Sequence, residues 1–452
     1  MRHDPAVSDR SSWLRAGAGS AVLALVLAAC NQGAASTALS ESSAAAPSSA
    51  PAASMDVASP SAAAPSGEPI VVGSTLSLTG AFAATGAIHN IVGEQFVERL
   101  NANGGLLGRP VEWTVQDDES DQARVSQLYE RLISQDRVDL IMGPYATPNI
   151  LSAMAVAERH GYVLPQHTAV IAPLLTYDCQ FPAWSIGFEP NVYVPTQLYE
   201  AVATLPEPPQ TVAFATNQNG STDFISRGLP DDETDPDARS IARDMGLEIV
   251  ADIQYPPGTT EWAPIATQLQ EADPDLIVNN SLGVDTVGLI QAMKQLDYDP
   301  PLIFSLFPAP GPLLGLGADA EGVLSVSIFE PNEAILDQYG PEVAEIVAEF
   351  ETAATAAGLP YTAFETQATA SWNAWEILVA GVEGAGSLDH EAICTSLHEN
   401  GAATTFSGDL TFDPAQNNFW PSNQGLKQIQ DGDWVMVYPP DRAAGTIQAA
   451  GN

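Results

Sequence analysis

The sequence predicts an α/β protein made of two doubly wound lobes, each built around a parallel sheet. Short β-branched runs alternate with stretches of helical periodicity along most of the chain, a pattern typical of such sheets. The length of 452 residues exceeds one ordinary hydrophobic core and fits two lobes. The first 67 residues differ sharply in composition, and we expect them to stand outside both lobes.

Residues 1–29 are typical of a secretory signal peptide. Three arginines precede a small, apolar stretch at 16–29 that is too short to span a bilayer. This stretch ends in Leu27-Ala28-Ala29-Cys30, which is similar to the lipobox of bacterial lipoproteins. In that family the cysteine carries a diacylglycerol and becomes the first mature residue, so the resemblance implies a lipid anchor at Cys30. The alternative is a short buried helix with an inert cysteine.

Residues 30–67 form a Ser/Ala/Pro-rich tract with few charges. Such a composition cannot bury enough apolar surface to fold, so we expect a disordered tether. A flexible chain of this length reaches roughly 35 Å. Anchor, tether and globular head together predict an extracytoplasmic protein held by lipid at a cell membrane, either in a periplasm or on the outer face.

The globular part opens with Ile70-Val71-Val72, a β-branched run that ends in Gly73-Ser74, as a buried parallel strand should. A helix is expected at 87–103, where apolar residues recur at helical spacing. The same alternation predicts strands at 111–115, 139–142, 162–164, 211–215, 248–253, 275–279, 302–305 and 323–328. It predicts the intervening helices at 121–135, 149–160, 237–245, 262–272 and 286–296.

The alternation of strands and helices ends after residue 328. Long helices are expected at 341–357, 364–384 and 390–400, followed by a β-meander at 405–412, 425–430 and 434–438. We expect this meander to close one of the two sheets because it is too short to form a domain.

The charge balance excludes a nucleic-acid binder. The chain carries 15 Lys and Arg against 56 Asp and Glu, a formal charge of −41, whereas phosphate binding needs clustered cations. Only Lys294 and Lys427 are lysines. The acidity indicates a strongly solvated surface and does not identify a ligand. Three cysteines and six scattered histidines exclude a disulfide scaffold and a cysteine-rich metal protein.

No catalytic signature is present. The chain has no Walker loop, Gly-x-Ser-x-Gly elbow or His-Glu-x-x-His motif, and the glycines at 315–322 have the wrong spacing for a dinucleotide loop. Asp117, Asp118, Glu119 and Asp121 follow a strand, and we interpret them as a solvated turn with a helix N-cap. We therefore expect no catalytic residue, cofactor or metal.

Two segments carry a family resemblance: Leu76-Ser77-Leu78-Thr79-Gly80, and the pattern N-x-x-GG-hydrophobic-x-GR-x-V at 101–111. They resemble the type I periplasmic substrate-binding proteins of ABC transporters, in the branch that binds branched-chain amino acids and amides. Further matches follow in order at Asp117-Asp118-x-Ser120-Asp121, Ile141-Met142-Gly143-Pro144, 255–260, 272–275 and 319–323. The resemblance covers residues 69 to 440.

This resemblance implies two lobes joined by a three-segment hinge, with crossings near 188–191, 329–332 and 404–407. Lobe one then comprises 69–187 and 333–404, lobe two comprises 188–328 and 407–440, and 441–452 is a tail. Cys179 and Cys394 both fall in lobe one and in an oxidising compartment. They form either a disulfide or two separate buried thiols.

The resemblance places one ligand-binding wall on three loops of lobe one. The first loop supplies Ser77, Thr79 and Gly80, whose hydroxyls and backbone either hold a ligand carboxylate or serve turn chemistry alone. The second and third loops supply Tyr145, Ala146, Thr147, Gln166, His167 and Thr168. Gln166 and His167 depart from the serine-rich family pattern, so branched-chain amino acid specificity does not transfer directly. His167 is either a ligand contact or a packed loop residue.

The resemblance places the facing wall on the lobe-two loops near 217–223, 280–285 and 307–308, with Asn219, Asp223, Ser281 and Asp285 as the expected contacts. A ligand ammonium would need a carboxylate, for which Asp223 and Asp285 are the candidates. Either could equally cap a helix or remain a solvated charge. The polar loop at 217–221 leaves an uncharged or amide-like ligand open.

The function implied is binding without catalysis. A small polar solute, an amino acid or an amide, would enter the cleft of a monomeric receptor and be recognised by an ABC permease and ATPase on separate chains. A chemosensory or regulatory receptor of the same fold is the first alternative. An extracellular lipoprotein hydrolase is a more distant one, because no nucleophile–base pair emerges from these loops.

Overall fold

The computed structural model describes residues 64–229 and 235–449. The predicted signal peptide, Cys30 and most of the predicted tether lie outside the described residues. The structure contains one sheet of three strands, one of seven, and two separate two-stranded ladders. We call the three-stranded sheet with its helices lobe one and the seven-stranded sheet with its helices lobe two. Among the described residues, no helix is long and apolar enough to cross a membrane.

Lobe one is built on three parallel strands in the order β2-β1-β3, with bounds Ile70–Leu76 for β1, Val111–Asp117 for β2 and Leu140–Ile141 for β3. β1 lies in the middle and is almost fully buried, as its β-branched sequence predicts. The early helices are α1 (Ala83–Ala102), α2 (Gln122–Arg131) and α3 (Thr147–His160). β4 (Leu164–Gln166) pairs in parallel with β5 (Gln180–Pro182).

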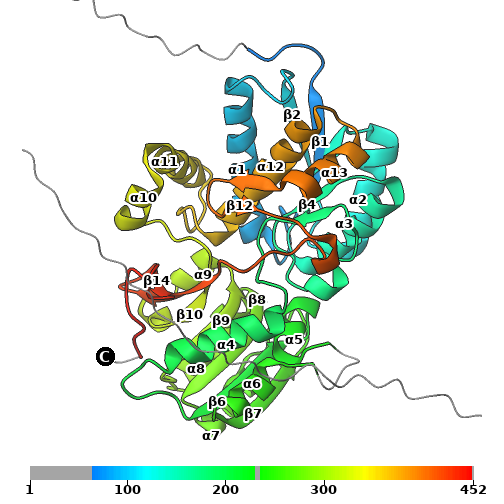
Figure 1. The fold of residues 1–452 in the computed structure, drawn as a ribbon. Helices are drawn as coiled ribbons and strands as arrows, with labels where there is room; N and C mark the ends of the chain where they lie inside the picture. The colour runs from blue at the N-terminus through cyan, green and yellow to red at the C-terminus, as the bar shows by residue number, and fades with distance from the viewer. Residues whose placement is uncertain (1–63, 230–234, 450–452) are drawn as a thin grey trace, which may run out of the picture. The chain divides into compact units, whose positions relative to one another are not determined.

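The late helices return to lobe one. They are α10 (Glu333–Tyr339), α11 (Pro341–Ala356), α12 (Thr366–Ala385) and α13 (His390–Asn400). Figure 1 shows α12 beside α1, so the first and last thirds of the chain share one core. That core includes Phe96 of α1, whose ring contacts those of Trp372 and Trp375 of α12. Cys179 and Cys394, 215 residues apart, form a disulfide between the loop before β5 and α13.

Lobe two is built on the sheet β14-β13-β10-β9-β8-β6-β7. Its parallel strands are β6 (Thr211–Asn217), β7 (Glu248–Tyr255), β8 (Leu276–Gly283), β9 (Ile303–Pro308) and β10 (Leu324–Ser327). Two antiparallel strands, β13 (Gly425–Gln430) and β14 (Asp433–Tyr438), extend one edge, so this part of the predicted meander does close a sheet.

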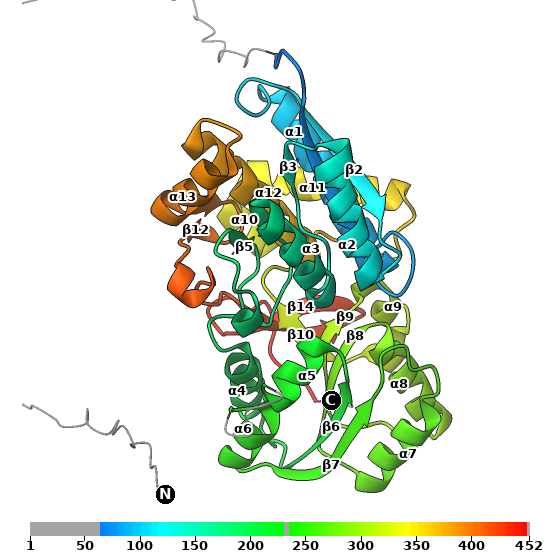
Figure 2. The same ribbon diagram turned by 90° about the vertical axis from the view of Figure 1, so that its right-hand side faces the viewer.

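Helices cover both faces of this sheet, as a doubly wound fold requires. In Figure 2, α4 (Pro190–Val202) and α6 (Ala238–Asp244) lie on one side of β6 and β7, and α7 (Ala263–Ala272) and α8 (Asp285–Gln295) lie on the other. α5 (Gly220–Arg227) packs on the α4 side, and the short α9 (Pro310–Leu314) follows β9.

Three features differ from the sequence-based expectations. The strand expected at 405–412 is wrong: β11 (Ala402–Thr404) and β12 (Gly408–Leu410) form a separate hairpin, closed by the Thr404 hydroxyl on the Gly408 carbonyl. Helix α4 was not expected, because Pro195 interrupts its pattern. Asp121 does cap α2, but Asp118 is fully buried and not solvated, since Ser77 and Thr75 donate hydrogen bonds to it.

The third crossing between lobes lies later in the chain than the range 404–407. Asn418 donates hydrogen bonds to the carbonyls of Asp178 and Gln180, and Trp420 donates one to the carbonyl of Pro182. These side chains hold the segment before β13 against lobe one. The chain therefore enters the seven-stranded sheet only at Gly425. The remaining lobe boundaries stay predictions.

Candidate functional site

The candidate site is a cavity at the carboxyl ends of strands from both sheets. Its lining residues are buried, and they surround a small cavity of about 20 Å³. Lobe one contributes Tyr145, Ala146, Thr147, Thr168, Val170, Trp184 and Gln367, and lobe two contributes Ser221, Leu282 and Phe307. A larger hollow around Lys294 lies at the amino ends of β9 and β10. Ligands of open α/β sheets bind at carboxyl ends, so the two-lobe cavity is the better candidate.

The loop after β3 forms one wall of the cavity. Ala146 adopts a left-handed backbone (φ +71°) and precedes α3 without a side-chain cap, so the first amides of α3 are oriented toward the loop end. Thr147 is the first residue of α3, and its hydroxyl accepts a hydrogen bond from the Val170 amide at 3.1 Å. This bond ties the loop after β3 to the loop after β4. Both loops then present their side chains to one cavity.

Behind this wall lies a stack of three rings. His167 packs on His89 of α1 with ring centroids 4.4 Å apart, and His89 packs on Tyr145 at 5.2 Å. Burial lowers the pKa of His167 to about 4 and holds the pKa of His89 well below its usual value. Both imidazoles are therefore neutral at pH 7. His167 supports the wall from behind and does not line the cavity, and Gln166 supports the same loop through its Oε1, which accepts from the Ala169 amide at 2.9 Å.

Ser77, Thr79 and Gly80 do not line the cavity either. The Ser77 hydroxyl donates to Asp118 at 2.6 Å, and the Thr79 hydroxyl donates to Asp117 at 2.7 Å. Gly80 has φ +85°, and a Cβ there would stand 2.6 Å from the Glu119 carbonyl oxygen. These residues join the loop after β1 to the loop after β2, which is the turn chemistry named as the alternative.

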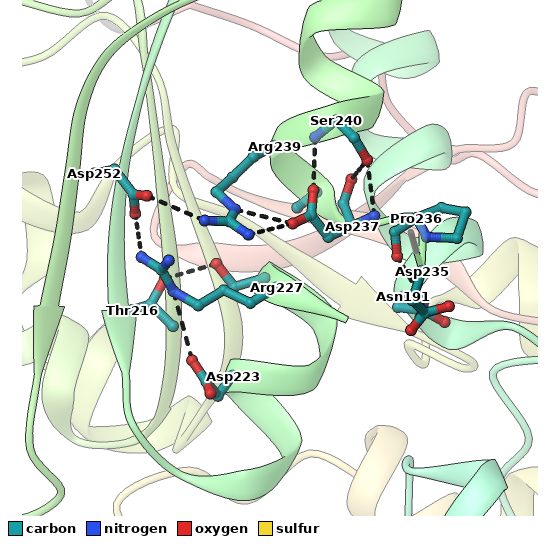
Figure 3. A network of polar contacts seen from close by, with 12 residues as sticks. Asn191, Thr216, Asp223, Arg227, Asp235, Pro236, Asp237, Arg239, Ser240 and Asp252 are labelled. Atoms are coloured by element: carbon teal, nitrogen blue, oxygen red, sulfur yellow. Dashed lines mark hydrogen bonds and ion pairs between the residues drawn. The ribbon is translucent and has the colours of Figure 1, made fainter. Parts of the chain in front are cut away.

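On lobe two, α5 brings Ser221 into the cavity wall. Asn219 is the N-cap of α5 and accepts hydrogen bonds from the Ser221 amide and hydroxyl, at 3.2 and 3.1 Å. Asp223, in the same helix, is paired with Arg227 at 3.6 Å on the exposed side. Figure 3 shows it at the end of a surface network that includes Arg227 and Asp252. The structure thus brings Ser221 to the cavity and takes Asp223 away from it.

Ser281 and Asp285 lie on the opposite face of the sheet from α5. The Asp285 carboxylate accepts hydrogen bonds from the Asn217 amide at 2.6 Å and the Tyr255 hydroxyl at 3.2 Å, and burial raises its pKa. The Ser281 hydroxyl is bonded to that of Thr286 at 2.9 Å. Neither residue lines the cavity, although Leu282 between them does.

Sequence reasoning missed Trp184, Gln367 and Val170, whereas Ser221, Leu282 and Phe307 lie in the three lobe-two loops to which the resemblance pointed. Trp184 follows β5, and Gln367 stands in the first turn of α12, so their meeting depends on tertiary structure alone. His89 was also missed. Its position among Ile88, Ile91 and Val92 on the buried face of α1 was the one local signal that could have marked it.

The cavity lining consists of uncharged side chains from both lobes. Within residues 64–229 and 235–449, no group of three or more His, Cys, Asp or Glu side chains could hold a metal ion. The aromatic rings of Trp184 and Phe307 meet edge to face, with centroids 5.8 Å apart, and thereby join lining residues of the two lobes.

A family model described as periplasmic binding protein matches residues 69–425. A relative, the substrate-binding protein BasB of the chemotactic signal transduction system of Halobacterium salinarum, is 32% identical over 107 residues, which is 23% of this chain and 26% of that protein. The match therefore spans about a quarter of the length of BasB.

Solved structures share the fold over nearly their full length. The branched-chain amino acid transporter substrate-binding protein LivJ from Streptococcus pneumoniae, in complex with isoleucine, matches with a TM-score of 0.67 and 18% identity, covering 82% of this chain and 100% of LivJ. An ABC transporter solute-binding protein from R. palustris, in complex with benzoate, matches with a TM-score of 0.68 and 16% identity, covering 85% and 98%. The type I periplasmic binding protein fold expected from the sequence is confirmed.

Proposed function

This chain belongs to the periplasmic binding protein family, and we propose that it is the extracytoplasmic, lipid-anchored solute receptor of an ABC importer. The observation that carries the proposal is the cavity lined by both lobes at the carboxyl ends of their strands. The expected solute is an amino acid or an amide-like small molecule. The proposed partners are an ABC permease and ATPase on separate chains, and the receptor acts as a monomer.

Binding in such a receptor is coupled to lobe closure. A solute that touches Thr147 and Trp184 on one side and Ser221 and Phe307 on the other gains its full set of contacts only when the lobes are together. It therefore stabilises the closed form over the open one by its differential affinity for the two. The permease would recognise the closed form, so transport follows occupancy of the cavity.

The proposed anchor is a lipid on Cys30, which lies outside the described residues. A Cys30→Ser variant should leave solute binding intact and release the protein from the membrane fraction. Release of the natural protein and of the variant to the same extent would refute the anchor without touching the binding proposal.

A ligand-sensing role is the second candidate, favoured by the similarity to BasB of a chemotactic signal transduction system. The two roles differ in the partner that reads the closed form. A transport receptor should stimulate the ATPase of a permease complex in a solute-dependent manner, whereas a sensor should bind solute without doing so. The hydrolase alternative needs a nucleophile bonded to a base, and among the described residues none of the hydroxyls that line the cavity is hydrogen-bonded to a histidine.

The test is thermal unfolding of the full chain with a panel of amino acids, short amides, urea and carboxylic acids, at low and high salt. A solute at a hundred times its dissociation constant should stabilise the protein by about 2.7 kcal/mol. The stabilisation by that solute should disappear in a Phe307→Asp variant, which places a charge in the cavity. It should persist in an Asp252→Asn variant on the exposed network. A hit that survives Phe307→Asp would place binding elsewhere and refute the proposed site.

A further inference from the structure

The ten side chains that line the cavity carry no charge. They are four aromatic or aliphatic residues from one hydrophobic cluster that both lobes share (Val170, Trp184, Leu282, Phe307), together with Tyr145, Ala146, Thr147, Thr168, Ser221 and Gln367. An ammonium group buried among such side chains would lose its hydration and gain no opposite charge, which is strongly unfavourable. The lining is therefore matched poorly to a zwitterionic amino acid.

The carboxylates nearest in sequence to the lining residues all form ion pairs or hydrogen bonds with other residues. Asp223, two residues after Ser221, pairs with Arg227. Asp285, three residues after Leu282, is held by Asn217 and Tyr255. Glu365, two residues before Gln367, caps α12 and stands 3.7 Å from the Lys427 ammonium. None of them is available to hold a ligand cation without breaking an interaction of its own.

Two hydrogen-bond donors on lining residues, by contrast, have no partner among the described residues of the protein. The Thr168 hydroxyl and the Trp184 indole N–H are buried, line the cavity and have no partner, and their residues are 6% and 2% exposed. Buried polar groups without partners are costly, so these two mark where a ligand would bind.

The start of α3 contributes to the same lining. Ala146 and Thr147 line the cavity at the uncapped N-terminus of a 14-residue helix, where backbone dipoles favour a negative group. Phe307, Leu282 and the ring carbons of Trp184 give the same lining an apolar surface. The cavity thus combines hydrogen-bond donors and positive potential with an apolar surface.

From this neutral lining with unpartnered donors and apolar side chains, we infer that the solute is a small carboxylic acid with an apolar body and without an ammonium group. Its carboxylate is held by the hydroxyl of Thr168, the indole N–H of Trp184 and the start of α3, and its apolar part packs against Phe307 and Leu282. The inference rests on the proposed receptor function and narrows it. The inferred solute differs from the expected amino acid in one group, because it lacks the ammonium.

The test is titration calorimetry of the full chain with two matched pairs. Each pair has one carbon skeleton with and without the ammonium: 4-methylpentanoate against leucine, and 3-phenylpropanoate against phenylalanine. We expect at least one acid to bind about tenfold or more tightly than its amino acid, because the amino acid buries an unpaired cation. Equal or tighter binding of the amino acids overturns the inference and leaves the receptor function in place.

Two variants test the assigned donors. Thr168→Val keeps the side-chain shape, Trp184→Phe removes the indole N–H, and each should weaken acid binding about fivefold or more through loss of a hydrogen bond. Thr352→Val, on the exposed face of α11, is the matched control and should change nothing. Unchanged acid affinity in both variants overturns the assignment. If amides bind and no acid does, the inference fails alone, whereas a flat response to every solute overturns the receptor function itself.

Discussion

The two lobes are held together by different kinds of interaction. In lobe two, five parallel strands between Thr211 and Ser327 form one continuous ladder, so backbone hydrogen bonds carry the sheet. In lobe one, the parallel sheet has three strands, and the segments that complete the lobe come from chain regions more than 200 residues apart. These segments are joined by the Cys179–Cys394 disulfide and by the hydrogen bonds of Asn418. Lobe one should therefore depend more on individual side chains than lobe two.

Loss of the disulfide should be the largest effect. In the loop-entropy description, a bond that closes a loop of about 200 residues stabilises the folded state by about 5 kcal/mol. Replacing Cys179 and Cys394 by serine should lower the free energy of unfolding by that order in denaturant titrations. Amide exchange should speed up in β4, β5 and α13 and stay slow in β6, β8 and β9. The Cys30→Ser variant is the control, and equal acceleration in both lobes would contradict the comparison.

The next effect concerns the junction of the lobes, where a lysine is buried between two carboxylates. The Lys427 ammonium on β13 stands 2.6 Å from Glu330 and 3.7 Å from Glu365, and all three side chains are at most 4% exposed. Lys427→Met would leave two buried carboxyls without their cation, a change that costs about 3–5 kcal/mol. Urea unfolding measures it.

The chain supplies its own matched control, because Lys294 is the only other lysine. Its ammonium pairs with Asp299 and Asp319 on the surface, and Lys294→Met should cost less than about 1 kcal/mol. If the two variants lose similar free energies of unfolding, burial of the Lys427 ammonium is not the reason for its contribution to stability.

The third effect is confined to lobe one because every histidine of the chain except His3 lies there. The pKa of His167 is lowered by burial from 6.5 to about 4 in the folded protein. Between these pH values the unfolded chain binds the proton and the folded chain does not, so stability is lost as the pH falls from 6.5 to 4. The contribution of this residue is about 3 kcal/mol over that range.

A His167→Phe variant should therefore flatten the pH dependence of the free energy of unfolding between pH 4 and 6.5, and retain the stacking on His89. Amide exchange at pH 5 should show lobe one opening before lobe two in the natural protein. An unchanged slope in the variant would mean that His167 accepts its proton in the folded state.

The same contrast explains how far the sequence could be used to predict the molecule. Every parallel strand of lobe two was expected within a few residues, because each is a local run of β-branched residues between helices. Lobe one was predicted less well after residue 400, since the hairpin at 402–410 depends on Thr405 bonding to Glu376 of α12. The cavity shows the same limit: Tyr145, Ala146, Thr147 and Thr168 follow strands and were expected, whereas Trp184 and Gln367 reach it only through tertiary contacts.

The smallest effect is expected on the exposed side of lobe two, where Arg239 bridges Asp237 and Asp252 (Figure 3). Its pKa is raised by these carboxylates against the effect of burial, yet its side chain is 23% exposed, so water and salt screen the pairs. Arg239→Gln should cost less than about 1 kcal/mol in urea at 0.1 M NaCl and still less at 1 M. Arg99→Gln, which removes the exposed pair with Glu349 at 2.9 Å in lobe one, is the counterpart. Since neither pair is buried, the two losses should be alike, and a loss at Arg239 as large as that at Lys427 would show that surface charge, and not the backbone ladder, holds lobe two together.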